Sequence, residues 1–261
     1  MNIKQKTFGL ACCIWALSST QCASVETVQT DGSPTQKLHV YLLIGQSNMS
    51  GRAPFTEDES RPMERCFLLD SIGNWESASN PLNRYSTIRK NLSMQKMGPG
   101  FSFAQAMLAI DSNIDLGLVV NARGGSAIEQ WAEDSKYYQE ALRRVSEAQK
   151  TGTLKGILWH QGEANVKNPN KYIDKLTKLV AQFRKDLGMP ELPFIAGQID
   201  GASPINDQTA MLPDRLPFTG VVSSEGLTLF EEDHFDAVSV KLMGKRYAEE
   251  MIRIQNTSQN K

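Results

Sequence analysis

Hydrophobic residues in this chain fall into short continuous runs, separated by longer segments in which they recur every three to four positions. Runs of this kind are typical of strands buried on both faces. Five such strands are predicted, at Leu38–Ile44, Leu116–Val120, Gly156–Trp159, Phe194–Ala196 and Val221–Ser223. Cys66–Leu69 is predicted as a further strand at an edge. Helical spacing with one apolar face predicts helices around residues 103–108, 138–148, 172–187 and 240–251.

The alternation of strands and helices predicts a parallel sheet with helices on both faces. In such a sheet, ligands bind at the carboxyl ends of the strands. We therefore expect the functional residues in the segments that directly follow each strand. Residues 50–100 show little periodicity and many polar positions, and we expect them to wrap the mouth of the site.

The first residues differ from the rest. Lys4 and Lys6 precede an apolar run, 8–17, and small and polar residues follow it. This layout is typical of a secretory signal peptide, and the run is too short to span a bilayer comfortably. A buried N-terminal helix is the alternative. Lipid attachment at Cys22 ranks second to simple cleavage, because Gln21 fits a lipoprotein signal poorly.

These observations divide the chain into four parts. We predict a signal peptide at 1–23, a polar linker at 24–36, one α/β domain at 37–256 and a tail at 257–261. One domain of this length can bury a sizeable core.

The charge balance narrows the class of partner. Lys and Arg total 28 residues against 29 Asp and Glu. A nucleic-acid binder needs a basic stripe to hold phosphates, so this balance argues against one, as it does against a polybasic membrane anchor. The domain retains one cysteine, Cys66, which we expect to be a small buried hydrophobe. The sequence has no HExxH motif or paired cysteines, and only three histidines. We therefore expect no metal site.

The first two segments after strands contain a serine and a glycine pair. Ser47 lies between Gly45 and Gly51, and glycines allow a tight turn that lifts a hydroxyl out of the backbone. Gly124 and Gly125 follow the strand at 116–120 and could present backbone N–H groups to an oxyanion.

Two later segments contain the other polar candidates. His160, Gln161 and Glu163 directly follow the strand that ends at Trp159. Gln161 could donate its amide to an oxyanion, and Glu163 could orient a histidine. Glu231 precedes His234 by three residues, so in a tight turn it can accept a proton from one ring nitrogen and leave the other free to act as a base.

Five blocks of the sequence also resemble SGNH hydrolases of the subgroup that contains sialate O-acetylesterase-like domains and carbohydrate esterase family 6. The blocks are 45–51 (GQSNMSG), 98–104 (GPGFSFA), 122–131 (ARGGSAIEQW), 159–165 (WHQGEAN) and 233–237 (DHFDA). This resemblance implies a flavodoxin-like, three-layer α/β/α sandwich and the deacetylation of a carbohydrate without a cofactor.

The resemblance also implies roles for individual residues. Ser47 is the expected nucleophile and His234 its base. The backbone N–H groups of Ser47 and of Gly124 or Gly125 are expected to form the oxyanion hole, with Gln161 as its side-chain donor. The residues expected to contact the substrate are Gln46, Asn48, Arg123 and His160.

The chain departs from the family pattern at one position. The family has Asp three residues before the histidine, where this chain has Glu231, which is one methylene longer. Glu163 is therefore a rival for the acid of the triad, with Glu231 ahead on local spacing.

We expect an exported O-acetylesterase whose partner is an acetylated carbohydrate, with acetylated xylan favoured by the compact single domain. A sialate O-acetylesterase and a non-catalytic glycan-binding module remain alternatives. A lipase is disfavoured because residues 56–61 are too polar to line a long apolar groove.

Overall fold

The computed structural model describes Met1 and residues 38–259. The predicted signal peptide and linker, and with them Cys22, lie outside the described residues. A seven-stranded sheet runs in the order β3-β2-β4-β1-β5-β6-β7. Its strands are β1 (Leu38–Gly45), β2 (Cys66–Leu69), β3 (Trp75–Ser77), β4 (Leu116–Val120), β5 (Gly152–His160), β6 (Phe194–Gly197) and β7 (Thr219–Val222). All neighbours pair in parallel except β3, which runs antiparallel to β2 at the edge.

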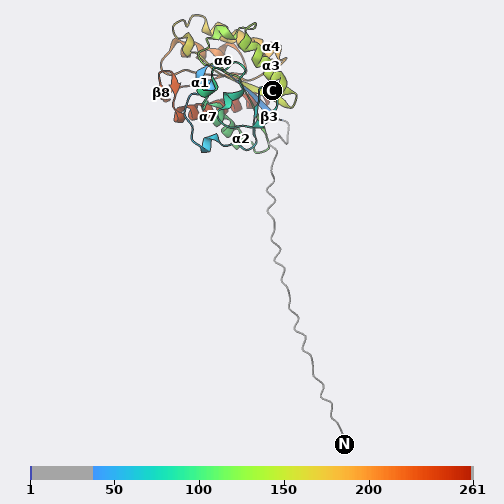
Figure 1. The fold of residues 1–261 in the computed structure, drawn as a ribbon. Helices are drawn as coiled ribbons and strands as arrows, with labels where there is room; N and C mark the ends of the chain where they lie inside the picture. The colour runs from blue at the N-terminus through green and yellow to red at the C-terminus, as the bar shows by residue number, and fades with distance from the viewer. Residues whose placement is uncertain (2–37, 260–261) are drawn as a thin grey trace. The chain divides into compact units, whose positions relative to one another are not determined.

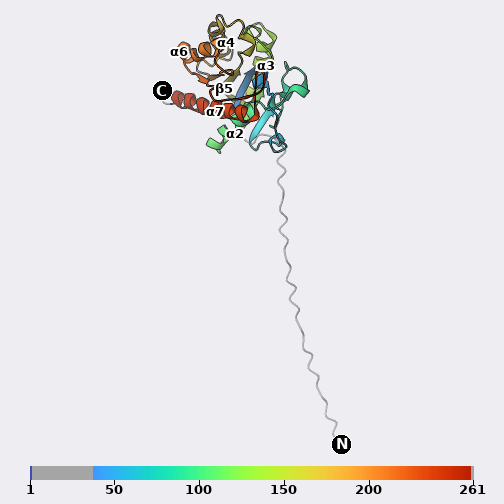
Figure 2. The same cartoon turned by 90° about the vertical axis from the view of Figure 1, so that its left-hand side faces the viewer.

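Helices cover both faces of this sheet. Helices α2 (Gly100–Ile110) and α7 (Ala237–Gln259) lie on one side, and α3 (Lys136–Gln149) and α4 (Tyr172–Asp186) lie on the other (Figures 1 and 2). Each face has its own buried hydrophobic cluster, because side chains of a strand alternate between the two faces. In β1, Tyr41 and Leu43 belong to the α2–α7 side, whereas Leu42 and Ile44 belong to the α3–α4 side. The predicted three-layer α/β/α class is confirmed.

Shorter elements occupy the connections. They are α1 (Ser47–Ser50), α5 (Pro204–Ala210), α6 (Leu212–Arg215) and the 3₁₀ turns η1 (Asp58–Ser60), η2 (Leu82–Tyr85), η3 (Leu92–Met94), η4 (Ile128–Trp131) and η5 (Glu163–Asn165). A separate hairpin pairs β8 (Leu229–Glu231) with β9 (His234–Phe235). Helix α7 continues to Gln259, past residue 256 where the sequence placed the end of the domain.

Strand order brings the predicted segments together. β1 lies between β4 and β5, with Leu43 opposite Val120 and Gly45 opposite His160. The chain leaves β1 toward one edge of the sheet, returns to β4, and then crosses to β5 on the other side of β1. Such a reversal opens a crevice at the carboxyl ends of the strands. The segments after β1, β4 and β5 therefore meet there.

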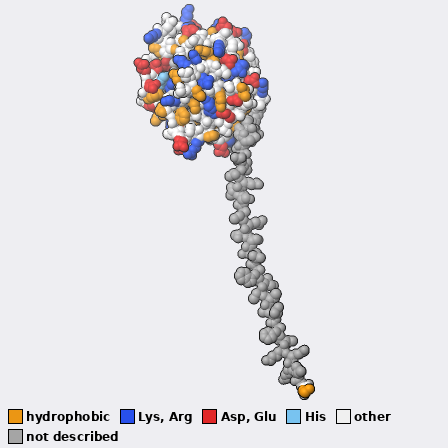
Figure 3. Space-filling view, in the orientation of Figure 1, with side chains coloured by type: hydrophobic (Ala, Val, Ile, Leu, Met, Phe, Trp, Pro, Cys, Tyr) orange, Lys and Arg blue, Asp and Glu red, His pale blue; other side chains and the backbone are white. Residues whose placement is uncertain are grey.

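The visible face of the described residues carries side chains of both charges. On the face shown in Figure 3, Lys and Arg side chains are interspersed with Asp and Glu. Within the described residues, no helix combines the length and the apolar character that crossing a bilayer requires.

Candidate active site

Ser47 is held in a turn that requires glycine before it. Gly45 ends β1 with a φ of +135°, and a methyl group there would lie 2.1 Å from the carbonyl oxygen of His160. The next residue, Gln46, donates its backbone N–H to that same oxygen at 2.8 Å. Ser47 then begins the four-residue helix α1. The turn after β1 is thus fixed against the end of β5, with the serine at its tip.

A pocket of about 270 Å³ opens at this turn. Its lining residues come from five segments: Gln46, Ser47, Arg52, Lys90, Met94, Gly124, Gly125, Glu163, Ala164, Asp233 and His234. The pocket therefore brings together the predicted nucleophile, base, glycine pair and rival acid. Arg52, Lys90 and Met94 come from the stretch that was expected to wrap the mouth of the site.

His234 and Glu231 face each other across the β8–β9 hairpin, as their spacing predicted. They form a register pair of that hairpin, and His234 Nδ1 lies 3.2 Å from Glu231 Oε2. This contact leaves Nε2 of the ring available for another partner. Among the described residues no hydrogen bond joins His234 to the Ser47 hydroxyl. In unliganded enzymes such catalytic contacts are often long and tighten only with substrate.

Backbone N–H groups are available beside Ser47. A methyl group on Gly124 would lie 3.7 Å from the Ser47 Cβ, so this glycine is adjacent to the nucleophile. Gly125 has a φ of +73°, a conformation that favours glycine. Within the described part of the chain, the N–H groups of Ser47, Gly124 and Gly125 donate to no backbone oxygen. They are therefore free to meet an oxyanion.

Gln161 does not line this pocket, and its amide is already occupied. Its Nε2 lies within hydrogen-bonding distance of three acceptors: Gln46 Oε1 and the Ser126 carbonyl oxygen, each at 3.1 Å, and Asn165 Oδ1 at 2.7 Å. An amide nitrogen carries only two hydrogens, so none remains for an oxyanion. The geometry instead gives Gln161 the task of orienting Gln46.

Gln46 is better placed to meet a substrate. Its Oε1 accepts from Gln161 Nε2 and, at 3.2 Å, from the Ala164 backbone N–H. Its own amide nitrogen donates to no group among the described residues, and the residue lines the pocket. The carboxamide is thus oriented by its oxygen, which leaves its nitrogen as a donor.

Glu163 is buried at the base of the pocket without touching His234. Its Oε1 accepts from Asn48 Nδ2 at 2.6 Å, and its Oε2 is buried without a hydrogen-bond partner. Burial raises the pKa of this carboxyl to about 7, and the nearby charge of Asp233 adds to the rise, whereas the bond from Asn48 opposes it. At neutral pH the protonated and charged forms of Glu163 are therefore both populated.

His160 lies behind Glu163, in the interior. Burial lowers the pKa of its imidazole to about 4, so the ring is neutral at pH 7. The Tyr247 hydroxyl donates to the Trp159 carbonyl oxygen at 2.7 Å, so it must accept from His160 Nδ1 at 3.1 Å. His160 Nε2 then carries a lone pair and lies 3.9 Å from Glu163 Oε1. Because His160 is fully buried and does not line the pocket, the structure does not bring it into reach of a substrate.

Asn48 and Arg123 are also committed to the protein. Asn48 is buried and makes three hydrogen bonds. Arg123 Nη1 donates to the carbonyl oxygens of Ile88 and Arg89, at 2.9 and 3.1 Å. Neither side chain lines the pocket. Of the four residues expected to contact the substrate, only Gln46 therefore lies in the pocket wall.

Two cations in the pocket wall were not singled out from the sequence. Arg52 Nη1 donates to the Ser50 hydroxyl and to the carbonyl oxygens of Gly51 and Met94. A methyl group on Gly124 would lie 2.5 Å from Arg52 Nη2, and one on Gly125 would lie 3.3 Å from Lys90 Nζ. Both cations thus border the glycine pair. Arg52 directly follows the Ser47 block, and this position is the only sequence signal that could have identified it.

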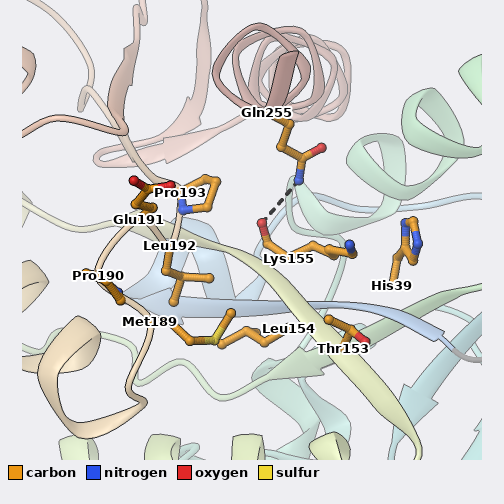
Figure 4. A pocket seen from close by; sticks show the side chains of 10 residues that line it. All are labelled: His39, Thr153, Leu154, Lys155, Met189, Pro190, Glu191, Leu192, Pro193 and Gln255. Carbon is orange, nitrogen blue, oxygen red and sulfur yellow. Dashed lines mark hydrogen bonds between the residues drawn. The ribbon is translucent and has the colours of Figure 1, made fainter. Parts of the chain in front are cut away.

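A larger cavity, of about 480 Å³, lies elsewhere (Figure 4). It opens beside the beginnings of β1 and β5, at His39 and at Thr153–Lys155, and α7 contributes Gln255. None of the candidate catalytic residues lines it. In the described part of the chain, no three His, Cys, Asp or Glu side chains are grouped so as to hold a metal ion.

Comparisons with known proteins place the chain in a family. A family model described as "Carbohydrate esterase, sialic acid-specific acetylesterase" matches residues 37–253. The chain is 31% identical over 220 residues to the Probable carbohydrate esterase At4g34215 of Arabidopsis thaliana, an alignment that covers 76% of this chain and 83% of the plant protein. The crystal structure of AT4G34215 superposes with a TM-score of 0.75 at 27% identity, covering 83% of this chain and 98% of the plant chain.

Two more distant structures share the fold. The crystal structure of NanS matches with a TM-score of 0.69 at 17% identity, over 86% of this chain and 99% of NanS. XAC1771, described as a novel carbohydrate acetylesterase from Xanthomonas citri, matches with a TM-score of 0.61 at 19% identity, over 83% of this chain and 56% of its own. The family model covers most of the chain, and with the plant relative it confirms the resemblance found in the sequence: the chain belongs to the sialic acid-specific acetylesterase family of carbohydrate esterases.

Proposed function

We propose that this protein is a serine esterase that removes O-acetyl groups from a carbohydrate, with Ser47 as nucleophile, His234 as general base and Glu231 as the acid that orients it. One observation carries the proposal: the serine, the histidine and the free N–H groups of the glycine pair converge on one pocket. The contact between His234 Nδ1 and Glu231 Oε2 at 3.2 Å supports Glu231 over Glu163, which does not touch the ring.

The reaction is a double displacement. His234 Nε2 takes the proton of the Ser47 hydroxyl as the serine oxygen bonds to the acetyl carbonyl carbon. The bond between that carbon and the sugar oxygen then breaks, and the sugar oxygen takes the proton from His234. A water molecule next gives its proton to His234 and attacks the acetyl carbon. Ser47 leaves with that proton, and acetate is released.

The negative oxygen of each tetrahedral intermediate needs donors that are already in place. The backbone N–H groups of Ser47 and of Gly124 or Gly125 supply them, each worth about 3 kcal/mol in comparable sites. We assign the side-chain donor to Gln46, in place of Gln161, because Gln161 has no free hydrogen, while the Gln46 amide nitrogen donates to none of residues 38–259.

The acyl group fits a small pocket. About 270 Å³ accommodates an acetyl group and part of one sugar ring, and this volume favours acetyl esters over long acyl chains. Acetylated xylan is our first candidate substrate. A specific observation favours a second candidate, an acetylated sialic acid: Arg52 and Lys90 border the glycine pair, where they could bind a carboxylate of the substrate.

We further propose that the protein is exported. The proposal rests on the basic and apolar pattern of residues 4–17, and detection of a shortened chain outside the cell would test it. If the full-length chain is retained inside, the export proposal is wrong.

The function is tested by acetate release with the mature protein and its Ser47→Ala variant. We expect release from a synthetic aryl acetate to fall by at least about 10⁴-fold in the variant, as in other serine hydrolases, with circular dichroism unchanged. Acetylated xylan and an O-acetylated sialic acid tested in parallel would separate the two substrate candidates. A folded wild-type protein that releases no acetate from any of the three would instead favour the non-catalytic glycan-binding module.

A further inference from the structure

Asn48, the residue after the proposed nucleophile, joins three segments that are far apart in sequence. Its Nδ2 donates to Glu163 Oε1 at 2.6 Å and to the Asp233 carbonyl oxygen at 2.8 Å. Its Oδ1 accepts from the Phe235 backbone N–H at 3.2 Å. Asp233 and Phe235 are the residues on either side of His234. A single side chain thus holds both neighbours of the proposed base.

These bonds use both N–H groups and the oxygen of the Asn48 amide. The side chain is 3% exposed and has no free donor to offer to a substrate. Its own backbone is fixed with the turn of α1, where the Gly51 N–H bonds to the Ser47 carbonyl oxygen at 2.9 Å. The three bonds therefore link the backbone of the serine turn to the backbone on both sides of His234.

Glu163 is the third anchor. It provides the acceptor for Asn48 Nδ2 and comes from the segment after β5, the strand that also fixes Gly45. The Glu163 backbone is part of η5, which begins just after β5 ends at His160. The Asn48 amide is thus tied to the end of the central sheet, the kind of support that a precise active site requires.

We propose that Asn48, oriented by Glu163, is a positioning residue that sets the distance between the Ser47 hydroxyl and the His234 ring. This inference rests on the proposed function, because it assumes that Ser47 and His234 react together. Glu163 then contributes to catalysis through Asn48 and the backbone around His234, and it does not contact the imidazole itself.

The first test replaces Asn48 with Ala and compares it with a matched asparagine. Asn206 is 7% exposed and makes the same number of side-chain bonds, all to the backbone: its Nδ2 donates to the carbonyl oxygens of Ile199 and Gly201, each at 2.8 Å, and its Oδ1 accepts from the Ile199 N–H at 2.9 Å. It lies outside the Ser47 pocket. Asn206→Ala therefore removes three hydrogen bonds of a similarly buried asparagine at a position outside the pocket.

We expect Asn48→Ala to lower kcat for an aryl acetate about 100-fold, because small displacements of reacting groups cost this much, while KM stays within about twofold. Asn206→Ala should lower the Tm to a similar extent and leave kcat within about twofold of wild type. Equal kcat values for the two variants would overturn the proposal, because they would show a purely structural role for Asn48.

A second test uses Glu163 and remains informative if Asn48→Ala fails to fold. Glu163→Gln keeps an oxygen that can accept from Asn48 Nδ2, whereas Glu163→Ala leaves this donor buried and unpaired. We expect Glu163→Gln to lose about tenfold or less in kcat and Glu163→Ala to lose about as much as Asn48→Ala. The double variant Asn48→Ala/Glu163→Ala should be no worse than either single one. A loss in Glu163→Gln as large as that in Glu163→Ala would overturn the positioning role.

Failure of the proposed function would look different. Reaction with an organophosphonate that labels activated serines should modify Ser47 in wild type and slow down about 100-fold in Asn48→Ala. If wild-type Ser47 is not labelled and no acetate is released, the serine esterase itself is wrong, and the positioning role is wrong with it. If wild type is labelled and Asn48→Ala is labelled at the same rate, only the positioning role is wrong.

Discussion

Two glutamates approach the proposed catalytic histidine from different surroundings. Glu231 lies in the β8–β9 hairpin, with 61% of its side chain exposed, and its Oε2 is 3.2 Å from His234 Nδ1. Glu163 follows β5 at the end of the sheet, with 7% of its side chain exposed, and it bonds to Asn48 in place of the histidine. The exposed acid contacts the histidine directly, and the buried acid contacts Asn48.

Burial of an acid and its contact with the histidine are therefore separate properties. A hydrated carboxylate beside an imidazole can stabilise the imidazolium without a large desolvation cost. A carboxyl in the interior is costly to charge, so it is better suited to accept a hydrogen bond and hold a neighbour. Glu163 lines the pocket and burial raises its pKa, but among the two glutamates it is Glu231 that contacts the His234 ring.

The largest effect is expected from Glu231→Gln, which removes the charge beside His234. We expect a loss of about 10²- to 10⁴-fold in kcat on an aryl acetate, because the neutral amide cannot stabilise the imidazolium or select its tautomer in the same way. Glu232→Gln, at the adjacent exposed position, is the control and should stay within about twofold. A Glu231→Gln variant as active as this control would reassign the acid of the triad.

A second prediction concerns how the stability of the protein depends on the protonation of Glu163. Burial raises the pKa of Glu163 from 4.5 to about 7. The preference of the folded state for the protonated carboxyl therefore contributes its full stability below pH 4.5, and this stability is lost as the pH rises through 7. Glu163→Gln removes this dependence. The free energy of unfolding of the variant minus that of wild type should therefore be about 3 kcal/mol larger at pH 8 than at pH 4.

Urea unfolding of both proteins at the two pH values measures this gain. Glu191→Gln, at an exposed position in the rim of the other cavity, should show no such difference from wild type. A gain near zero for Glu163→Gln would mean that the interior accommodates the charge.

The smallest expected effect is that of salt, which should weaken the exposed Glu231–His234 contact more than the buried Glu163–Asn48 contact. Raising the ionic strength from about 0.01 to 1 M shortens the screening length from about 30 to 3 Å. We expect wild-type kcat on a neutral ester to fall about two- to threefold, because screening weakens the Glu231–His234 interaction. The same titration of Glu231→Gln should be flat, and an identical salt dependence in both proteins would contradict the assignment.

Much of the fold could be predicted from periodicity. Long apolar runs such as Leu38–Ile44 are determined by burial on both faces, and the structure confirms them as strands of the sheet. The missed elements are short and depend on tertiary contacts. β3 has three half-buried residues, and its Trp75 Nε1 donates to Thr151 Oγ1, a partner 76 residues away. Nothing in the local pattern signals such an element.

In the candidate site, too, the contacts between residues close in sequence could be predicted and the distant ones could not. The contact between Glu231 and His234 could be predicted because a three-residue spacing in a tight turn is local information. The role of Gln161 could not, because its competing acceptors come from Gln46, Ser126 and Asn165. Asn48 was expected to meet substrate, yet its partners lie 115 to 187 residues away. A sequence shows which polar groups gather at a strand end, but not which of them satisfy one another.

The strand order has a consequence for how this architecture can change over time. β1 pairs directly with β4, although residues 46–115 separate them in the chain. That excursion begins with the Ser47 turn, and its later part supplies Arg52, Lys90 and Met94 to the pocket wall. The entropy of closing a loop grows only slowly with its length, so we expect insertions or exchanges beyond residue 51 to alter what the pocket admits while the paired strands keep the serine turn and the glycine pair in register. If Ser47 and the glycine pair perform the chemistry as proposed, residues 52–115 are where the substrate range could diversify while the reaction is retained.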